Sequence, residues 1–410
     1  MRLFRLLILS LLIILVIVGL SNYSINRSKL PIVVPIDVPK DASMQEKLTS
    51  IDRWLYSLSK EKQFNGAILI SNKNKPDLMN IYGYQDVNKE IPLTLQSSFR
   101  LGSISKQFTA MAIMILHNKQ RLEYDDPVQK YLPTFPYSDV TIRNLLTHSS
   151  GIADYMDLAF KEYFSFFTKI GFYLNQSMVN IFYKGEPSKY KDHYTVLTSE
   201  DVLRMISKYH SKRIFLSNER YLYSNSGYVI LSLIVEAVTG KTFELFLDEE
   251  IFNPLDMENS SFWNLFTSEN KISNRVQGTN GDRLNDFSWM DGVSGDGSIF
   301  MSIEDFIKWD RALESYSLIP QSEFNKALEP FISSKGDTTY YGFGWSLSKS
   351  KNSISHSGSW LGAVTYIYRK IDTNSMFVFL ESSTSKYSYE IRKEIQKVLN
   401  NSEPYMFRWE

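Results

Sequence analysis

Strand-like segments lie at both ends of this 410-residue chain, and a mainly helical stretch of about 103–330 separates them. Near the start, two apolar runs at 66–71 and 78–84 flank a turn-rich segment. Runs of the same kind lie near the end of the chain, at 342–348, 364–369 and 376–380. A sheet that draws on both groups would place the two ends of the chain side by side.

Helical patterns flank the two groups of strands. In the first helix the apolar residues fall on one face: Met44, Leu48, Ile51, Leu55 and Leu58. A closing helix is expected near 387–399. Because a sheet and its helices bury their apolar faces against each other, this order predicts one sheet built from both chain ends. The helical stretch is then an inserted lobe, and the expected fold class is α/β (α+β).

The charges and the missing residue types exclude several classes of function. The 45 basic and 45 acidic residues balance, so nothing concentrates positive charge for binding nucleic acid. The absence of cysteine excludes disulfides, thiolate catalysis and thiolate metal sites. The five histidines show no HExxH or comparable spacing, so we expect neither a zinc site nor another cofactor.

The N-terminus has the pattern of an export signal. Arg2 and Arg5 precede a run at 6–20 that is apolar except for Ser10. Its length lies between the roughly 7–15 residues of a secretory signal and the about 18 of a spanning helix. We predict an uncleaved signal anchor at 1–24 and a membrane-anchored, extracytoplasmic protein. Cleavage near Gly19 or Ser21 would instead give a secreted one.

The exported part divides into a linker and one large domain. Residues 31–39 contain three prolines, and we predict a linker over 25–43 with an extended path. The domain is expected to span 44–405. Within it, the segment 155–195 is rich in Tyr and Phe, which suits a helical insertion with its own core or an aromatic flap over a site or membrane surface.

The chemistry-bearing residues begin with Ser103 and Lys106, at the start of a helical pattern over 103–117. Residues three apart share a helix face, so the Lys106 amine would lie beside the Ser103 hydroxyl. A serine hydroxyl needs a neighbouring base, and a desolvated lysine can serve. The pattern alone is weak, because Ser-x-x-Lys also occurs at Ser57 and elsewhere in the chain.

Two further segments add polar groups to this candidate site. A Tyr-x-Asn, Tyr223 and Asn225, enters an apolar helix, where it could line a cleft or simply provide a helix cap. Before the strand at 363–369 come His356, Gly358 and Ser359. The glycine there permits close backbone approach to a ligand, although an ordinary turn explains it equally well.

In their order and spacing these segments resemble the serine β-lactamase and penicillin-binding protein superfamily, in its class C-like branch. That branch includes β-lactamases, D-aminopeptidases, D,D-carboxypeptidases and esterases. The resemblance covers about 46–400, without the insertion. It extends to other segments: Leu145-Leu146-Thr147-His148-Ser149-Ser150-Gly151-Ile152, Asn253-Pro254-Leu255-Asp256-Met257, Ser294-Gly295-Asp296-Gly297-Ser298 and Tyr341-Gly342-Phe343-Gly344-Trp345.

The resemblance implies a β-lactamase/transpeptidase-like fold with an antiparallel sheet and flanking helices. It also implies a set of roles. Ser103 would be the acylated nucleophile and Lys106 its activator, while Tyr223 would exchange protons; which of the last two is the base stays open. Asn225, His356 and Gly358 would orient substrate, and the backbone N–H groups of Ser103 and Ser359 would form the oxyanion hole. The segment around His148 would be structural.

Two departures from the family pattern bear on the substrate. Where lactamases usually have Lys-Thr-Gly, this chain has His356-Ser357-Gly358, and an ordinary histidine is mostly neutral at pH 7. Esters or D-amino-acid and peptide substrates are therefore favoured over β-lactams. The Pro-Gly that often precedes the Tyr-x-Asn is also replaced, around 216–219, which leaves the path of that loop open.

We predict a serine hydrolase that forms a covalent acyl-enzyme with a small-molecule or peptide substrate. A transpeptidase would use the same groups, with an amine in place of water. A non-catalytic envelope protein that kept the fold for binding is the alternative from another class. The four reactive side chains, on Ser103, Lys106, Tyr223 and Asn225, are nevertheless all present. The sequence leaves the oligomeric state unknown.

Overall fold

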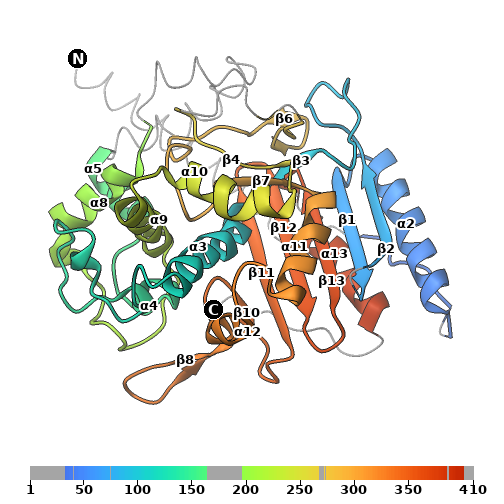
Figure 1. Ribbon diagram of the computed structural model, residues 1–410. Helices are drawn as coiled ribbons and strands as arrows, with labels where there is room; N and C mark the ends of the chain where they lie inside the picture. The colour runs from blue at the N-terminus through green and yellow to red at the C-terminus, as the bar shows by residue number, and fades with distance from the viewer. Residues whose placement is uncertain are drawn as a thin grey trace, which may run out of the picture.

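Six antiparallel strands form the central sheet, in the order β10-β11-β12-β13-β1-β2 (Figure 1). The structure is a computed structural model that describes residues 33–400 except 40, 74, 164–195, 267–271, 273 and 386. Two strands come from the start of the chain and four from its end: β1 (Gly66–Asn72), β2 (Lys75–Tyr82), β10 (Ser346–Leu347), β11 (Ser353–Trp360), β12 (Ala363–Lys370) and β13 (Ser375–Glu381). The predicted sheet from both chain ends is confirmed.

The two chain ends meet where β1 pairs with β13. Gly66 lies opposite Glu381 and Asn72 opposite Ser375, in an unbroken antiparallel register. Successive side chains of a strand point to opposite faces, so the apolar run of β1 serves both. Ala67 and Leu69 join the larger core cluster, whereas Ile68 and Ile70 join the smaller one.

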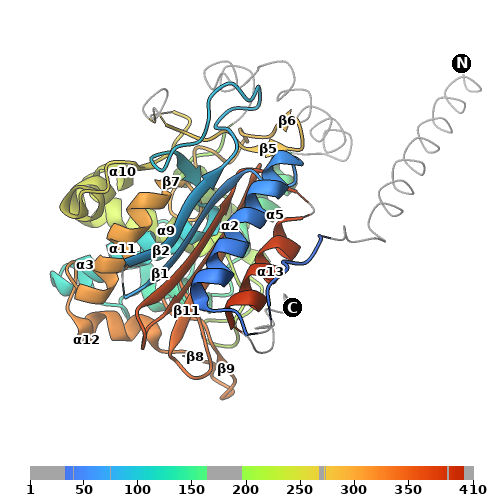
Figure 2. The ribbon, with the colours of Figure 1, turned by 90° about the vertical axis from the view of Figure 1, so that its right-hand side faces the viewer.

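Two helices cover one face of the sheet: α2 (Met44–Lys60) and α13 (Ser388–Asn400). They lie side by side in Figure 2. The N-terminus of α2 is fixed by a capping box in which Ser43 and Glu46 satisfy each other's backbone N–H groups. Four of the five predicted apolar residues of α2 are buried, whereas Met44, in the first turn, is 51% exposed.

The remaining helices form the lobe on the other side of the sheet (Figure 1). In the described part of the chain they all lie between β2 and β10, as the helical stretch in the sequence predicts. Their bounds are α3 (Lys106–Asn118), α4 (Ile142–Leu146), α5 (Tyr155–Tyr163), α8 (Ser199–Lys208), α9 (Asn225–Thr239), α10 (Phe243–Leu247), α11 (Ile303–Ser315) and α12 (Gln321–Phe324), with short helical turns at η1 (Gly102–Ser105), η2 (Val128–Lys130), η3 (His210–Lys212), η4 (Asp248–Phe252), η5 (Asn253–Leu255) and η6 (Asn325–Leu328).

Short strands also lie within this lobe. A three-stranded sheet, in the order β3-β7-β4, joins segments far apart in the sequence, and two small hairpins accompany it. Their bounds are β3 (Ser98–Arg100), β4 (Ser260–Phe262), β5 (Thr279–Asn280), β6 (Arg283–Leu284), β7 (Ile299–Ser302), β8 (Phe331–Ile332) and β9 (Thr338–Thr339). Because β3 leads directly into η1, its pairing with β7 fixes where the helical segment with Ser103 begins.

Strand β11 is the main correction to the sequence-based prediction. The stretch from His356 to Ser359 lies inside β11 rather than in a turn before the next strand, and it pairs with β12 over its whole length. Five of the eight residues of β11 are serine or glycine, and only Ile354 and Trp360 are of the β-branched or aromatic types that signal a strand. The register with β12 therefore defines it. In contrast, β10 covers only two residues of the run predicted at 342–348.

The described part of the predicted linker packs against the domain. Val33 and Ile36 are buried in the same cluster as α2, and the Trp54 indole donates to the Val34 carbonyl oxygen at 2.9 Å. No helix within the described ranges has the length and apolar character needed to cross a membrane. The predicted signal anchor at 1–24 and most of the aromatic-rich segment, 164–195, lie outside the described residues.

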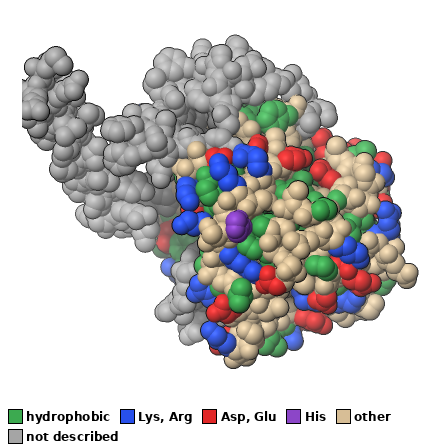
Figure 3. Space-filling view, turned by 90° about the vertical axis from the view of Figure 1, so that its left-hand side faces the viewer, with side chains coloured by type: hydrophobic (Ala, Val, Ile, Leu, Met, Phe, Trp, Pro, Cys, Tyr) green, Lys and Arg blue, Asp and Glu red, His purple; other side chains and the backbone are tan. Residues whose placement is uncertain are grey.

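One face of the molecule is shown in Figure 3. Lys and Arg side chains are interspersed there with Asp and Glu side chains, and apolar groups lie between them. Mixed signs at close spacing keep the electrostatic potential of a surface small. On the visible part of this face, charge does not single out a binding surface.

Candidate active site

Ser103 and Lys106 lie on one continuous helical segment, where η1 runs into α3. The Nζ of Lys106 lies 3.2 Å from the Oγ of Ser103. The three-residue spacing therefore brings amine and hydroxyl together, as the sequence predicts. Lys106 is fully buried, with an exposed fraction of 0%, while Ser103 is half-buried and reaches a cavity.

The Lys106 amine is held by two other oxygens. It donates to the Asn225 Oδ1 at 2.8 Å and to the Asp296 carbonyl oxygen at 2.8 Å. Both of these atoms can only accept, so they fix two of the three Nζ positions as N–H donors. The third position faces Ser103. When the amine is neutral, that position is its lone pair, which can accept the Ser103 proton.

The environment makes a neutral Lys106 accessible near neutral pH. Burial lowers the pKa of Lys106 from its usual 10.5 to about 8, and the carboxyls of Asp296 and Asp154 oppose that shift. At pH 7 roughly one amine in ten is then neutral. The site therefore supplies a base without needing strongly alkaline conditions.

Asn225 is not a helix cap. It is the first residue of α9, and Ser224, at the cap position, makes no capping hydrogen bond through its side chain. The Asn225 N–H donates instead to the Asp154 Oδ2 at 2.9 Å, which leaves the amide oxygen for Lys106. The Asn225 side chain thus contacts Lys106 instead of capping α9, and its role towards a substrate stays a prediction.

Tyr223 lies behind the serine, against the amine. The Lys106 Nζ is 5.0 Å from the centroid of the Tyr223 ring. Burial raises the pKa of the Tyr223 hydroxyl well above its usual value, and nearby Ser103 lowers it in part. The hydroxyl is buried and finds no hydrogen-bond partner of good geometry among the described residues. A substrate leaving group could provide that partner.

The loop that carries Tyr223 is held by the segment around His148. The Leu222 N–H donates to the His148 carbonyl oxygen at 2.9 Å, and the Ser224 N–H donates to His148 Nδ1 at 3.1 Å. The His148 ring also packs on the Tyr223 ring, with centroids 4.2 Å apart. This is the path that the sequence left open, and it gives His148 a positioning role beneath the site.

Strand β11 approaches the nucleophile along its backbone. Gly102, at φ +56°, is so close that an added Cβ would lie 3.0 Å from the Ser359 N atom. An added Cβ on Gly358 would lie 2.0 Å from the Leu101 carbonyl oxygen. Glycine at 358 therefore permits the close approach that the sequence suggests, and the N–H groups of Ser103 and Ser359 lie on neighbouring segments.

His356 lies on β11 behind the cavity, with both ring nitrogens engaged. Its Nδ1 is 2.7 Å from the Ser357 carbonyl oxygen, which only accepts, so Nδ1 carries the proton. The Nε2 then accepts from the Tyr341 hydroxyl at 3.0 Å. Burial, helped by the charge of Lys106, lowers the pKa of His356 to about 3. The ring is neutral, and its predicted contact with substrate stays a prediction.

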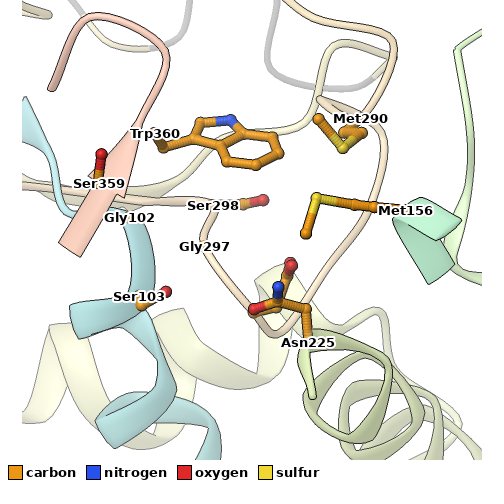
Figure 4. Close-up of a pocket in the computed structure, with 10 residues that line it drawn as sticks. Gly102, Ser103, Met156, Asn225, Met290, Gly297, Ser298, Ser359 and Trp360 are labelled. Carbon is orange, nitrogen blue, oxygen red and sulfur yellow. The ribbon is translucent and has the colours of Figure 1, made fainter. Parts of the chain in front are cut away.

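A cavity of about 110 Å³ opens in front of Ser103 (Figure 4). Ten described residues line it: Gly102, Ser103, Met156, Asn225, Met290, Asp296, Gly297, Ser298, Ser359 and Trp360. Three of the predicted site residues, Ser103, Asn225 and Ser359, therefore reach it. Lys106, Tyr223, His356 and Gly358 are not in the cavity wall and lie behind it.

Asp296 is the main site residue that the sequence-based prediction missed. It is 7% exposed, its carbonyl oxygen holds Lys106, and its Oδ2 accepts from the Tyr155 hydroxyl at 3.0 Å. Burial raises the pKa of Asp296 to about 6, against the opposing charge of Lys106. The sequence did contain a signal for this residue: Asp296 lies between Gly295 and Gly297, in a segment that resembles the family.

Known proteins are similar to most of this chain. The family model described as Beta-lactamase matches residues 51–399. Penicillin-binding protein 4* of Bacillus subtilis (strain 168) is 29% identical over 379 residues, which cover 88% of this chain and 77% of that protein. The Teichoic acid D-alanine hydrolase of Staphylococcus aureus (strain NCTC 8325 / PS 47) is 25% identical, covering 88% and 80%.

A solved structure matches the fold over most of the chain. The octameric penicillin-binding protein homologue from Pyrococcus abyssi superposes with a TM-score of 0.68 at 24% identity. The match covers 87% of this chain and 78% of the homologue. The mixed fold, an antiparallel sheet with helices around it, is therefore shared with this homologue.

Proposed function

This chain belongs to the Beta-lactamase family, and from that premise we propose that it is a hydrolase that forms a covalent acyl-enzyme on Ser103. The observation that carries the proposal is the buried Lys106 amine. It contacts Ser103 while two acceptor oxygens, on Asn225 and Asp296, fix the rest of its hydrogens. This arrangement is that of an activated nucleophile.

The reaction proceeds in two halves. In acylation the Ser103 Oγ bonds to the substrate carbonyl carbon, its proton passes to the base, and the bond from that carbon to the leaving oxygen or nitrogen breaks as the leaving group takes up a proton. In deacylation a water oxygen bonds to the same carbon, the bond to Oγ breaks, and the serine regains its proton. The net reaction adds one water across an ester or amide.

Two groups are available for the proton transfers. The neutral Lys106 amine can take the Ser103 proton directly, because its lone pair faces the hydroxyl. The Tyr223 ring lies against the same amine, and burial raises the pKa of its hydroxyl. A raised pKa keeps the Tyr223 hydroxyl protonated at neutral pH, so it does not start as a base; it can pass its proton to the leaving group if it regains one from protonated Lys106. We assign the base role to Lys106 and the proton supply to the leaving group to Tyr223.

The tetrahedral intermediate needs donors for its oxyanion. The N–H groups of Ser103 and Ser359 are the proposed pair, and the glycines at 102 and 358 allow the two segments to approach. Removing one such donor in serine hydrolases costs about 2.7–4 kcal/mol of transition-state stabilisation. We therefore expect the close approach of β11 to η1 to raise the rate of catalysis as well as to stabilise the fold.

Esters, D-amino-acid derivatives and peptides are favoured over β-lactams as substrates. A lysine in place of His356 would present a cation to a substrate carboxylate, but His356 is buried and neutral. The name of one relative, Teichoic acid D-alanine hydrolase, describes removal of D-alanine from a polymer. Both observations support a substrate that does not depend on a free carboxylate for binding.

We also propose that the domain acts outside the cytoplasm, anchored by residues 1–24. The support is the basic and then apolar N-terminal sequence. Protease treatment of intact cells should then remove the domain and leave the anchor in the membrane fraction. Full-length protein that stays protected in the soluble fraction would contradict the proposal.

Hydrolysis assays test the catalytic proposal directly. The purified full-length chain is assayed with D-alanine methyl ester, a D-aminoacyl amide and a chromogenic β-lactam. We expect turnover of an ester or amide above that of the β-lactam, and its loss in Ser103→Ala. Ser57→Ala is the matched control, because Ser57 begins another Ser-x-x-Lys on the exposed side of α2 and should not affect turnover. Equal rates in both variants would overturn the proposal.

A further inference from the structure

The charged side chain that lines the cavity in front of Ser103 is acidic. Of the ten described residues that line it, Asp296 alone has a charged side chain. Lys106 lies behind the cavity wall, and the Asp154 and Asp296 carboxyls both act on its charge. When all three are ionised, two negative charges surround one positive charge, so a bound ligand meets an excess of negative charge.

Asp296 is rigidly held and still able to bind. Its Oδ2 accepts from the Tyr155 hydroxyl, which comes from α5, and its carbonyl oxygen accepts from Lys106. A carboxylate has about four acceptor positions, so these contacts leave room for a donor on a ligand. The Lys106 amine contacts both the Asp296 backbone carbonyl oxygen and the Ser103 Oγ, and Asp296 and Ser103 line the same cavity.

The opposite wall of the cavity is apolar. Met156, Met290 and Trp360 point into the same space across from Ser103 and Asn225 (Figure 4). The cavity volume of about 110 Å³ is well below the roughly 300–1,000 Å³ of typical small-molecule pockets. A short aliphatic side chain fits such a space, and a long acyl chain does not.

We propose that Asp296 is a specificity-determining residue that selects small acyl groups bearing a protonated amine on the carbon next to the scissile carbonyl. The inference rests on the proposed acyl-enzyme at Ser103 and names the substrate class for that same site. The amine would bind the Asp296 carboxylate, and the small side chain would face Met156, Met290 and Trp360. Small aminoacyl esters and amides have this chemistry.

The selectivity would come from a charge-assisted hydrogen bond between the substrate ammonium and the Asp296 carboxylate in a partly buried site. Such a bond is shorter and stronger than a neutral one, because little water competes for the carboxylate. The same carboxylate repels an anionic substituent at that position. A bound ammonium would also oppose protonation of Lys106, so the correct substrate would favour the neutral base.

Three methyl esters of nearly equal shape test the selection in the wild-type chain. D-alanine methyl ester carries an ammonium beside the carbonyl, methyl isobutyrate carries a methyl there, and monomethyl methylmalonate carries a carboxylate. Proton release at constant pH gives kcat/KM for each. Each kcat/KM is divided by the rate constant for hydrolysis of the same ester by hydroxide, because an ammonium next to the carbonyl already activates an ester. After that division we expect the ammonium ester to exceed the neutral one by about 10- to 100-fold, and the anionic ester to be slowest. Equal values, or a preference for the neutral or anionic ester, would overturn the proposal.

Asp296→Asn tests the residue itself. The ratio of kcat/KM for the ammonium ester over the neutral ester should fall at least about 10-fold, mainly through KM. The matched control is Asp157→Asn, which removes the same charge from an exposed position on α5 next to Met156 and should leave the ratio unchanged. A ratio that survives in Asp296→Asn, or falls equally in the control, would contradict a direct role.

A separate probe distinguishes failure of this inference from failure of the proposed function. Fluorophosphonate labelling of Ser103 needs the nucleophile but no ammonium on the ligand. If Ser103 is labelled and the three esters are not discriminated, the hydrolase proposal stands and the selection by Asp296 is wrong. If Ser103 is unreactive and no ester turns over, both fail. If Asp296→Asn does not fold, the three-ester comparison in the wild type still decides.

Discussion

The Nζ of Lys106 lies 3.2 Å from the Oγ of Ser103, on the same face of one helical segment. Neither residue reaches the other by a long-range contact, because their spacing in the sequence already sets the distance. The surroundings add the burial that lowers the pKa of the amine. The local sequence thus sets the distance between the amine and the hydroxyl, and the tertiary fold sets the pKa of the amine.

Lys106→Met should abolish most of the activity while the chain still folds. Methionine fills a similar volume but can neither accept the Ser103 proton nor donate to Asn225 and Asp296. We expect kcat/KM to fall about 10³-fold or more, equivalent to about 4 kcal/mol. Loss of the two hydrogen bonds should lower the free energy of unfolding by about 1–3 kcal/mol, measured with urea. Lys130→Met, at an exposed lysine, is the control, and wild-type turnover in Lys106→Met would refute its role.

The activity should rise with pH towards a plateau above about pH 8. Only the neutral amine can accept a proton, and burial lowers the pKa of Lys106 to about 8, so its neutral fraction grows through that range. Methyl isobutyrate is the right substrate for the profile, because it does not titrate itself. A rate that falls as the pH rises from 6 to 8 would show that protonated Lys106 is the active form.

The midpoint of that profile should move to lower pH in Asp296→Asn. The Asp296 carboxylate raises the pKa of Lys106, in opposition to burial, so its removal lets the pKa fall further. The same methyl isobutyrate profile, recorded for the variant and the wild type, measures the shift. An unchanged or higher midpoint would mean that the titration belongs to another group.

Gly358→Ala should lower the rate by displacing β11. An added Cβ would lie 2.0 Å from the Leu101 carbonyl oxygen, so the strand must move away from η1 and take the Ser359 N–H with it. We expect kcat/KM to fall by about 100-fold or more, as for loss of an oxyanion donor. Gly281→Ala is the control: its Cβ would meet no atom within 4 Å, but its φ of +63° strains an alanine, so it should cost stability without lowering kcat/KM. Normal kcat/KM in Gly358→Ala would argue against Ser359 as a donor.

One buried ion pair should affect stability without touching the site. The Arg369 Nε on β12 lies 2.6 Å from the Asp310 Oδ1 on α11, and both side chains are almost fully buried. Arg369→Met leaves Asp310 buried without its partner, which typically costs about 3–5 kcal/mol. Lys89→Met breaks an exposed pair with Asp282 and should cost less than about 1 kcal/mol. Equal losses in urea unfolding would contradict this assignment.

The sequence predicted the sheet and its two flanking helices because their signals are local. Apolar runs and helical periodicity specify β1, β13 and α2 directly. Strand β11 escaped prediction because its serines and glycine satisfy no strand preference. Only pairing with β12 makes it a strand.

The same contrast between local signals and tertiary contacts applies to the candidate active site. The contact between Ser103 and Lys106 was predictable because three residues separate them, but the resemblance of the surrounding segments was needed to choose this Ser-x-x-Lys among several. The contact of Asp296 with Lys106 was not predictable. It is made by the backbone carbonyl oxygen of Asp296, 190 residues away in the sequence, and every residue has such a carbonyl. The state of His356 was also hidden, since its low pKa comes from burial and from Lys106, neither of which the sequence shows.

The position of a fluorophosphonate adduct tests the central claim most directly. The purified full-length chain is treated with the reagent and digested, and the modified peptide is identified by mass spectrometry. We predict a single adduct on Ser103, absent from Ser103→Ala and strongly reduced in Lys106→Met. An adduct on another residue, or equal labelling of the wild type and Ser103→Ala, would contradict the account.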